Sequence, residues 1–311
     1  MPAASETVRI CHFSDLHLPL QERVPLMRLV GKRGLGYANL RILRGKTHKL
    51  AAFEALLKRA ASEKADLTIV TGDVANLAVE FEYAFIDRLL RAGGLDPART
   101  LVLPGNHDRY TLGSDLVSAF ETGMRDWLPP GFDRRAGYPI VRAVGPVLVL
   151  GLDTAVWRNA VRSSGRVDPA QVKRLRAALG GEDARGRWPV IALHHPPFRR
   201  EGRLLRDYRA GLEGAKLLTG ALAGVRATVL HGHLHELSRR AMGGLDIIGV
   251  TSASNDRGKA KMQLAYHLYT FDGTGLRSAV AVRHWPDRPA ADRFERTDLP
   301  DEVPVDTRGV F

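Results

Sequence analysis

Residues 8–17 read VRICHFSDLH and decide the fold: an apolar, β-branched run ends in the polar triplet Asp15-Leu16-His17. Four later apolar runs end in the same way, in Gly72-Asp73, Gly105-Asn106-His107-Asp108, His194-His195-Pro196 and Gly232-His233-Leu234-His235. Seven of the 11 histidines lie in these five motifs or, in the case of His231, directly beside one. Carboxylate, amide and imidazole groups bind hard and borderline divalent cations. The pattern therefore predicts a hydrolase that uses two metal ions.

The composition is that of an ordinary globular protein with an excess of positive charge. The 311 residues are 44% hydrophobic and 26% charged, with a net charge of +12 and a pI of about 10.2. This balance favours anionic partners such as phosphate-rich substrates, nucleic acid or an anionic membrane surface. The single cysteine, Cys11, excludes an internal disulfide. With no apolar run of about 18 residues and no signal-peptide pattern at the start, we expect a cytoplasmic protein.

Strand-like and helix-like stretches alternate along most of the chain. We expect strands over residues 8–14, 67–71, 101–104, 147–152, 190–193, 228–230, 245–250, 265–271 and 279–284. We expect helices over residues 47–64, 79–92, 114–127, 169–179 and 213–223. The helix at Pro169 is the best marked, with Asp168 as its N-cap and Gly180 beyond its end. The alternation predicts an α/β core, and the strand-rich part beyond about residue 223 predicts a second, partly antiparallel sheet.

Two stretches lie outside this alternation. Residues 19–50 carry eight Lys or Arg and one acidic residue, Glu22, mixed with apolar side chains. That combination suits an acyl chain, a membrane interface or a partner protein, or else a cap that packs on the core. Residues 286–311 are polar and rich in Pro and Asp, so we expect an irregular C-terminal tail. The remaining residues 1–285 are expected to form one domain, with 19–50 as an insertion near the site.

Each motif alone is weak evidence, because Asp-x-His is common and Gly-Asp is usually a turn. The position of the motifs is more informative, because each one directly follows an expected strand. In open α/β sheets the loops beyond the carboxyl ends of the strands meet at one crevice. Glycine also lets the backbone of such loops approach a ligand closely. We therefore expect the five motifs to form one site.

Together the motifs resemble those of the calcineurin-like metallophosphoesterases, whose pattern is D-x-H, G-D, G-N-H-[DE], H-x-P and G-H-x-H. This sequence reads D-L-H, G-D, G-N-H-D, H-H-P and G-H-L-H, and the resemblance covers residues 8–285. It implies an α/β fold of four layers, αββα, in which two mixed β-sheets are flanked by helices. It also implies a hydrolase that acts on phosphoric ester bonds.

The resemblance further implies a set of ligands for two divalent metal ions. Asp15, His17 and His235 would bind one ion, Asn106, His194 and His233 would bind the other, and Asp73 would bridge both. Manganese, iron and zinc all suit such ligands. Purple acid phosphatases place a tyrosine ligand where this chain has Asn76, so a purple Fe(III) centre is not expected.

Three residues beside the expected ligands need separate assignments. The H-x-P spacing selects His194 as the ligand, and strand alternation turns the ring of His195 away, so His195 either supports the site or contacts substrate. His107 is expected to face the substrate, where it stabilises developing charge or protonates the leaving oxygen. Asp108 is expected to orient His107 and raise its pKa. The alternative for His107 is a structural hydrogen bond.

The residues expected to contact substrate are mainly basic. Arg199, Arg200 and Arg203 begin a run of arginines that suits phosphate recognition, or that simply forms a solvated loop. With the insertion, they favour a phosphorylated small-molecule or lipid-linked substrate with an anionic head and an apolar body. Residues 19–50 also suit peripheral contact with a membrane. Nucleic acid is less favoured, because no basic stripe interleaved with aromatic residues stands out.

The leading functional prediction is a phosphodiesterase or pyrophosphatase that uses a metal-activated hydroxide. A phosphomonoesterase or a nuclease of the same fold is the alternative. A non-catalytic scaffold is the alternative from another class, and the intact set of expected ligands argues against it. The sequence does not indicate the oligomeric state.

Overall fold

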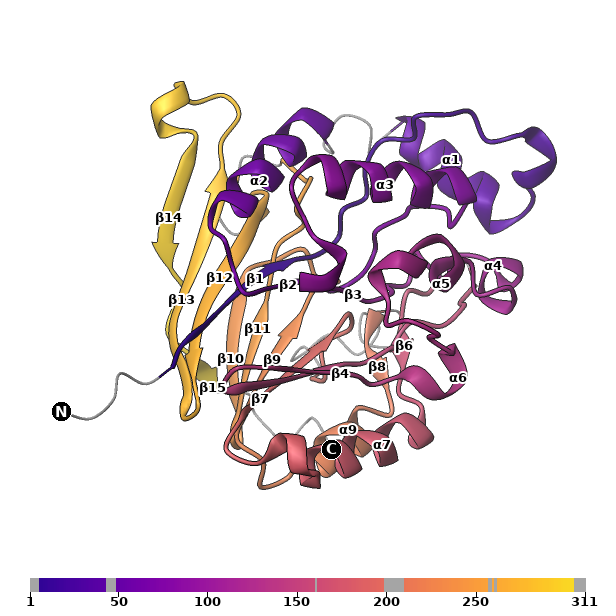
Figure 1. Ribbon diagram of the computed structural model, residues 1–311. Helices are drawn as coiled ribbons and strands as arrows, with labels where there is room; N and C mark the ends of the chain where they lie inside the picture. The colour runs from indigo at the N-terminus through magenta and orange to yellow at the C-terminus, as the bar shows by residue number, and fades with distance from the viewer. Residues whose placement is uncertain are drawn as a thin grey trace.

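The computed structural model describes residues 6–42, 49–159, 161–198, 210–256, 259 and 262–304. Two β-sheets pack face to face, with helices on both outer sides (Figure 1). One sheet has the strand order β14-β13-β12-β1-β2-β3, and the other has β15-β10-β11-β9-β7-β5-β4. Both are mixed: β1 (Val8–Phe13) pairs parallel with β2 (Leu67–Val70) and antiparallel with β12 (Ala265–Asp272). The predicted four-layer αββα fold is confirmed.

The central strands are covered on both faces. β1, β5 (Val147–Gly151) and β9 (Ala227–His231) are buried along nearly their whole length, which is why they appear in the sequence as continuous apolar runs. The other strands predicted from the sequence are β3 (Thr100–Val102), β7 (Trp188–Leu193), β11 (Leu245–Gly249) and β13 (Gly275–His284). Ile10, Val149 and Leu230 lie in one core that joins the two sheets.

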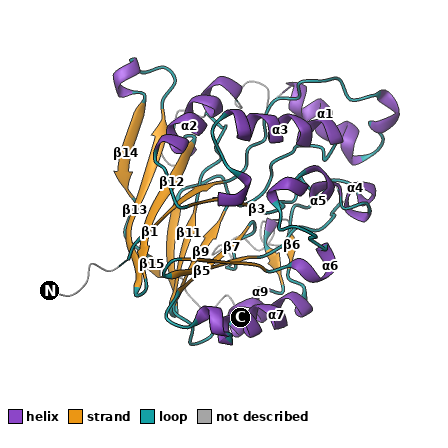
Figure 2. Ribbon diagram, in the orientation of Figure 1, coloured by secondary structure: helices purple, strands orange, loops and turns teal. Residues whose placement is uncertain are grey.

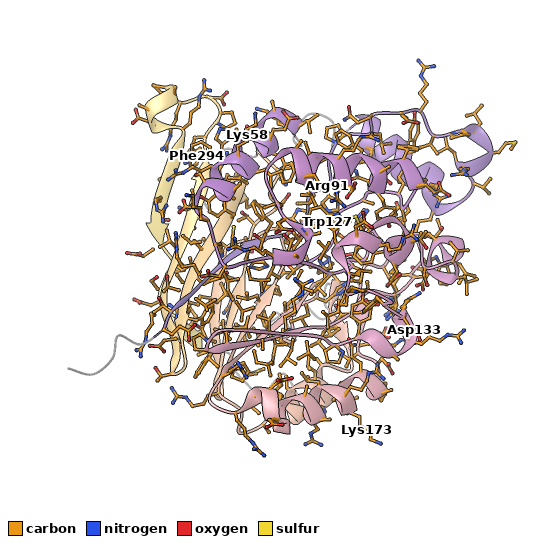
Figure 3. All side chains as sticks on the ribbon, viewed as in Figure 1. Lys58, Arg91, Trp127, Asp133, Lys173 and Phe294 are labelled. Atoms are coloured by element: carbon orange, nitrogen blue, oxygen red, sulfur yellow. The ribbon has the colours of Figure 1, made fainter. Side chains whose placement is uncertain are left out.

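Helices cover the outer faces. α2 (Leu50–Ser62) and α3 (Glu80–Ala92) flank one sheet, whereas α7 (Pro169–Gly180) and α9 (Ala215–Ala221) flank the other (Figure 2). α7 begins as predicted, because the Asp168 carboxylate accepts two backbone N–H groups of its first turn. Leu175 of α7 is buried in a second apolar cluster with Leu148 of β5. Figure 3 shows Lys173 at the outer edge of the molecule and Trp127 within its body.

The single helix predicted over residues 114–127 is wrong. The segment forms α4 (Leu112–Leu116), α5 (Ala119–Gly123) and the 3-10 turn η4 (Arg125–Trp127). Ser118 breaks the first two apart with a φ of 51°, which lies in the left-handed region and cannot continue a right-handed helix.

The strands beyond residue 223 do not form a sheet of their own. β9 and β11 extend the sheet of β7 and β5, whereas β12 and β13 return to the sheet of β1. The two sheets are therefore built from interleaved parts of the chain. The predicted second, partly antiparallel sheet is present, but it includes β4, β5 and β7 from before residue 223.

Several elements have no clear sequence signal. β4 (Ile140–Val144) alternates between buried and exposed residues, and β10 (Ser238–Met242) is mostly half-buried. The other unpredicted elements are β6 (Gly165–Arg166), β8 (Leu212–Glu213), α1 (Lys32–Ile42), α6 (Arg134–Gly137) and the 3-10 turns η1 (Leu26–Arg28), η3 (Pro97–Arg99), η5 (Glu182–Ala184) and η7 (Ala290–Asp292). Within the ranges described above, no helix combines the length and apolar character needed to cross a membrane.

The C-terminal segment is more ordered than its composition predicts. β14 (Phe294–Asp298) pairs antiparallel with β13, and β15 (Val303–Pro304) pairs parallel with β10. Residues up to 304 therefore extend both sheets and are not an irregular tail. β14 has no fully buried residue, so it lacks the apolar run that would have predicted a strand.

Candidate metal centre

Five loops bring the sequence motifs together at the carboxyl ends of five strands. The loops after β1, β2 and β3, which are parallel neighbours in one sheet, carry Asp15, His17, Asp73 and Asn106. The loops after β7 and β9, which are parallel neighbours in the other sheet, carry His194, His233 and His235. The predicted convergence of the motifs on one site is thus found.

Two glycines let these loops approach one another. A Cβ atom on Gly105 would lie 2.2 Å from Asp73 Oδ1, and one on Gly232 would lie 2.6 Å from Asp15 Oδ2. Contacts this short do not occur, so a side chain at either position would displace a carboxylate of the site.

The backbone of the site is strained. The φ angles are positive at Asp15 (54°), His17 (40°), Asp73 (53°), His233 (67°) and His235 (52°). Each such residue costs on the order of 1–3 kcal/mol, and this kind of strain concentrates at functional sites. The surrounding contacts must therefore hold these five residues in place.

The first group of candidate ligands consists of Asp15, His17 and His235. His235 Nε2 lies 2.9 Å and His17 Nε2 lies 3.8 Å from Asp15 Oδ1. Two atoms that each lie about 2.1 Å from one cation, at right angles, are about 3 Å apart, so this spacing fits shared coordination. The backbone N–H of His233 donates to Asp15 Oδ2 at 2.9 Å, which leaves Oδ1 for the two imidazoles.

The second group consists of Asn106, His194 and His233. His194 Nδ1 donates to the Thr71 carbonyl oxygen at 2.6 Å, and His194 Nε2 faces Asn106 Oδ1 at 3.3 Å. His233 Nε2 donates to the Ala210 carbonyl oxygen at 3.0 Å, so its Nδ1 is the nitrogen available to a metal. Backbone carbonyls that fix the tautomer in this way are typical around metal-binding histidines.

Asp73 lies between the two groups. Its Oδ2 is 3.2 Å from His17 Nε2 and 3.5 Å from His194 Nε2. Its Oδ1 accepts the backbone N–H of His107 at 2.7 Å. Oδ2 is therefore the atom that both groups share.

The charges of the site fit divalent cations. Asp15 and Asp73 are both buried carboxylates. Burial raises the pKa of Asp73, but the imidazoles of His194, His107 and His17 outweigh it and hold that pKa well below its usual range. Burial lowers the pKa of His194, yet the carboxylates of Asp73 and Asp15 raise it to about 9. A cation in this position would displace the proton that His194 otherwise holds.

His107 lies beside His17 and Asp73, but Asp108 does not orient it. His107 Nδ1 donates to the Asn76 carbonyl oxygen at 2.7 Å, and its ring stacks on Tyr110 with centroids 5.1 Å apart. The Asp108 carboxylate instead accepts the backbone N–H groups of Gly105, Val74 and Ala75 at 2.8, 3.2 and 3.0 Å. Asp108 therefore joins the loops after β2 and β3, because its side chain points back into the protein.

His195 is buried, with Nδ1 2.9 Å from Thr154 Oγ1 and Nε2 3.0 Å from the Ser163 carbonyl oxygen. Both ring nitrogens thus bond to the protein, which fits a supporting role and not a substrate contact. Arg199, Arg200 and Arg203 lie outside the described residues.

Glu82, at the start of α3, was missed by sequence reasoning. Its carboxylate accepts the backbone N–H groups of Asn76, Leu77 and Val79 at 2.8 to 3.2 Å. It thereby fixes the loop whose Asn76 carbonyl holds His107. A glutamate in the first turn of a helix is common, so its spacing gave no sign of this role.

A cavity of about 220 Å³ opens beside the centre. Its lining includes Asn106 and His107 of the centre together with Lys32, Tyr110 and Arg162. A larger cavity of about 690 Å³ lies elsewhere, between Asp115, Arg134 and Arg174. Of these two cavities, only the smaller is lined by residues of the five motifs.

The fold and this site define a phosphoesterase. The family model described as calcineurin-like phosphoesterase matches residues 8–237. The chain belongs to this family, and it is a hydrolase that acts on phosphoester bonds with divalent metal ions. The family model ends shortly after His235, so it spans all five motifs.

The relatives differ in what they do. A protein of Synechococcus sp. (strain WH7803) named "Probable cyclic nucleotide phosphodiesterase" is 29% identical over 212 residues, 62% of this chain and 68% of that protein. The purple acid phosphatase PPD1 from yellow lupin seeds shares the fold, with a TM-score of 0.62 and 12% identity over 96% of this chain. This chain spans about half of that phosphatase, 54%. GAP50, described as the anchor in the inner membrane complex of Plasmodium, matches with a TM-score of 0.50 and 9% identity over 95% of this chain and 90% of its own.

Proposed function

We propose that this protein is a phosphodiesterase or pyrophosphatase with a dinuclear metal centre. The observation that carries the proposal is the position of Asp73 Oδ2, 3.2 Å from one group of imidazoles and 3.5 Å from the other. A carboxylate oxygen placed in this way suits a bridge between two cations. The Synechococcus relative supports cleavage of a diester.

The roles of the residues follow from the two groups. Asp15, His17 and His235 would hold one divalent cation, Asn106, His194 and His233 the other, and Asp73 both. The cations, when bound, supply Lewis acidity to the phosphoryl oxygens and lower the pKa of water towards about 7. The neutral amide of Asn106 keeps the negative charge of the ligands low, so the centre stays attractive to an anionic phosphoester.

His107 handles the proton of the leaving group. Its Nδ1 donates a hydrogen bond to the Asn76 carbonyl oxygen. Nε2 is therefore the ring atom that can donate a proton to the leaving group when the ring is protonated. The backbone N–H of His107 also holds Asp73 Oδ1. The same residue thus joins the bridging carboxylate to the wall of the cavity.

The test combines metal analysis with hydrolysis. We expect purified protein reconstituted with Mn²⁺, Fe²⁺ or Zn²⁺ to bind about two ions per chain and to hydrolyse bis(p-nitrophenyl) phosphate faster than p-nitrophenyl phosphate. A preference for the monoester would favour a phosphomonoesterase. Strong salt-dependent retention of DNA in a gel shift would favour a nuclease. A protein that binds no metal and hydrolyses nothing would favour a scaffold, as the shared fold of the Plasmodium anchor illustrates.

A second candidate substrate is a lipid-linked phosphoester. Four large apolar side chains of the insertion are mostly exposed: Leu26 (85%), Met27 (89%), Val30 (78%) and Leu35 (67%). Arg23 and Lys32 lie close to them in the chain, and apolar plus basic residues suit an acidic lipid surface. Sedimentation with phosphatidylglycerol vesicles tests this idea. Binding that survives Met27→Glu with Leu26→Glu would rule it out.

A further inference from the structure

Helix α1 of the insertion brings a cation to the cavity beside the metal centre. Lys32, the first residue of α1, lines this cavity together with Asn106 and His107. Its Nζ lies 4.4 Å from the centre of the Tyr110 ring and donates to the Arg158 carbonyl oxygen at 3.2 Å. Tyr110 in turn stacks on His107. The ammonium group is thus linked to the active site through one aromatic ring.

The position of α1 is fixed by contacts with the catalytic loops. Arg33 donates to the carbonyl oxygens of Leu77 and Ala78 at 3.2 and 3.4 Å, in the segment that follows Asp73. Gly36 packs so closely that a Cβ atom there would lie 2.2 Å from the Tyr110 hydroxyl. Lys32 is therefore held at the cavity by its helix and does not merely reach it with a flexible side chain.

In the part of the chain that the structure describes, cations outnumber carboxylates around the cavity. Glu213 pairs with both Arg158 and Arg162, so one carboxylate already serves two guanidinium groups. Within the described ranges no carboxylate lies within 4 Å of Lys32 Nζ. A partly buried ammonium without a counter-ion is unfavourable, and an anion brought by the substrate would relieve that cost.

Lys32 is charged at neutral pH. Burial lowers its pKa to about 8, while the negative charge of Asp73 opposes the shift.

We propose that Lys32 binds a second anionic group of the substrate, so that the preferred substrates are pyrophosphate diesters and not diesters with a single phosphate. This inference rests on the proposed function. The scissile phosphate would lie at Asp73 and Asn106, and the neighbouring phosphate would lie in the cavity against Lys32. Bis(p-nitrophenyl) phosphate has no such second charge, whereas ADP-ribose, a pyrophosphate diester, does.

The test compares Lys32→Met, Lys32→Gln and Lys32→Arg with Arg28→Met, a control that removes an exposed cation of the same insertion. For the metal-reconstituted enzyme we expect Lys32→Met to lower kcat/KM for ADP-ribose about ten- to hundredfold, mainly through KM, because it removes one charge-assisted hydrogen bond. The value for bis(p-nitrophenyl) phosphate should change less than about threefold. Lys32→Arg should keep most of the activity, and Arg28→Met all of it.

Calorimetry supplies a readout that needs no catalysis. Wild type should bind α,β-methylene-ADP more tightly than AMP, and Lys32→Met or Lys32→Gln should remove that difference at unchanged metal content. Equal losses for both substrates would place Lys32 on the scissile phosphate and overturn the inference, as would unchanged kinetics in both variants. If the wild-type enzyme hydrolyses neither substrate, the proposed function fails, whereas the calorimetric difference still decides the role of Lys32.

Discussion

Helix α1 lies beside the metal centre, but the two regions are held in place by different kinds of contact. At the centre, the carboxylates of Asp108 and Glu82 fix six backbone N–H groups of the loops that carry the ligands. α1 is anchored to the catalytic loops mainly through Arg33 and the contact of Gly36 with Tyr110, while Leu35 stays exposed. The contacts at the centre therefore hold the strained backbone that carries the ligands, whereas the contacts of α1 hold Lys32 at the wall of the cavity. We expect changes at the centre to abolish chemistry and changes in α1 to alter substrate choice.

The most severe change is the removal of the shared ligand. Asp73→Asn keeps the shape of the side chain but removes the negative charge between two groups of imidazoles. We expect metal content to fall by at least one ion per chain and kcat/KM to fall by more than about 100-fold. Mutation of a residue that only hydrogen-bonds to a metal ligand already lowers metal affinity or activity by up to about 100-fold. Metal analysis and steady-state kinetics measure both. Asp126→Asn, an exposed surface carboxylate, is the control, and full metal content with near-normal activity in Asp73→Asn would refute the bridge.

His107 separates chemistry from metal binding. His107→Ala keeps the backbone N–H that holds Asp73 Oδ1 but removes the ring that faces the cavity. We expect unchanged metal content and a loss of about 10²- to 10⁴-fold in kcat, the usual contribution of a positioned acid or base. A bis-ester with a better leaving group should lose less. Near-normal kcat on the poorer leaving group would show that the His107 ring is only structural.

Asp108 tests the rigidity of the centre. Asp108→Asn replaces one acceptor oxygen by an N–H₂ group that must face either the N–H group of Ala75 or those of Gly105 and Val74. We expect the free energy of unfolding to fall by about 1–3 kcal/mol and metal affinity to fall about 10- to 100-fold. Chemical denaturation and metal titration measure the two effects. Lower activity at saturating metal with unchanged affinity would instead assign Asp108 to the chemistry.

The contrast also explains which features the sequence could predict. The strands β1 and β9 were predictable because both their faces are buried, and their apolar runs end at the ligands. The role of Asp108 was mispredicted because its acceptor oxygens serve Val74 and Ala75, 34 and 33 residues away. Lys32 meets Arg158 from 126 residues away, and no local spacing encodes such a contact. Sequence motifs therefore predict the short loops at the ends of strands. They do not predict the wall of the cavity, because it is formed by segments that are far apart in the sequence.

The mildest change acts on α1 alone. Gly36→Ala places a Cβ atom 2.2 Å from the Tyr110 hydroxyl, so either α1 or the Tyr110 ring must shift at the cavity wall. Overpacking costs about 1–3 kcal/mol, and alanine returns about 1 kcal/mol of helix propensity, so the net loss of stability should be small. We expect unchanged metal content and kcat, with a rise of about three- to tenfold in KM for ADP-ribose. Gly113→Ala in α4, where a Cβ meets nothing within 4 Å, should leave KM unchanged. If Gly36→Ala lowered metal content as well, α1 would be part of the rigid centre, and the contrast between the two regions would fail.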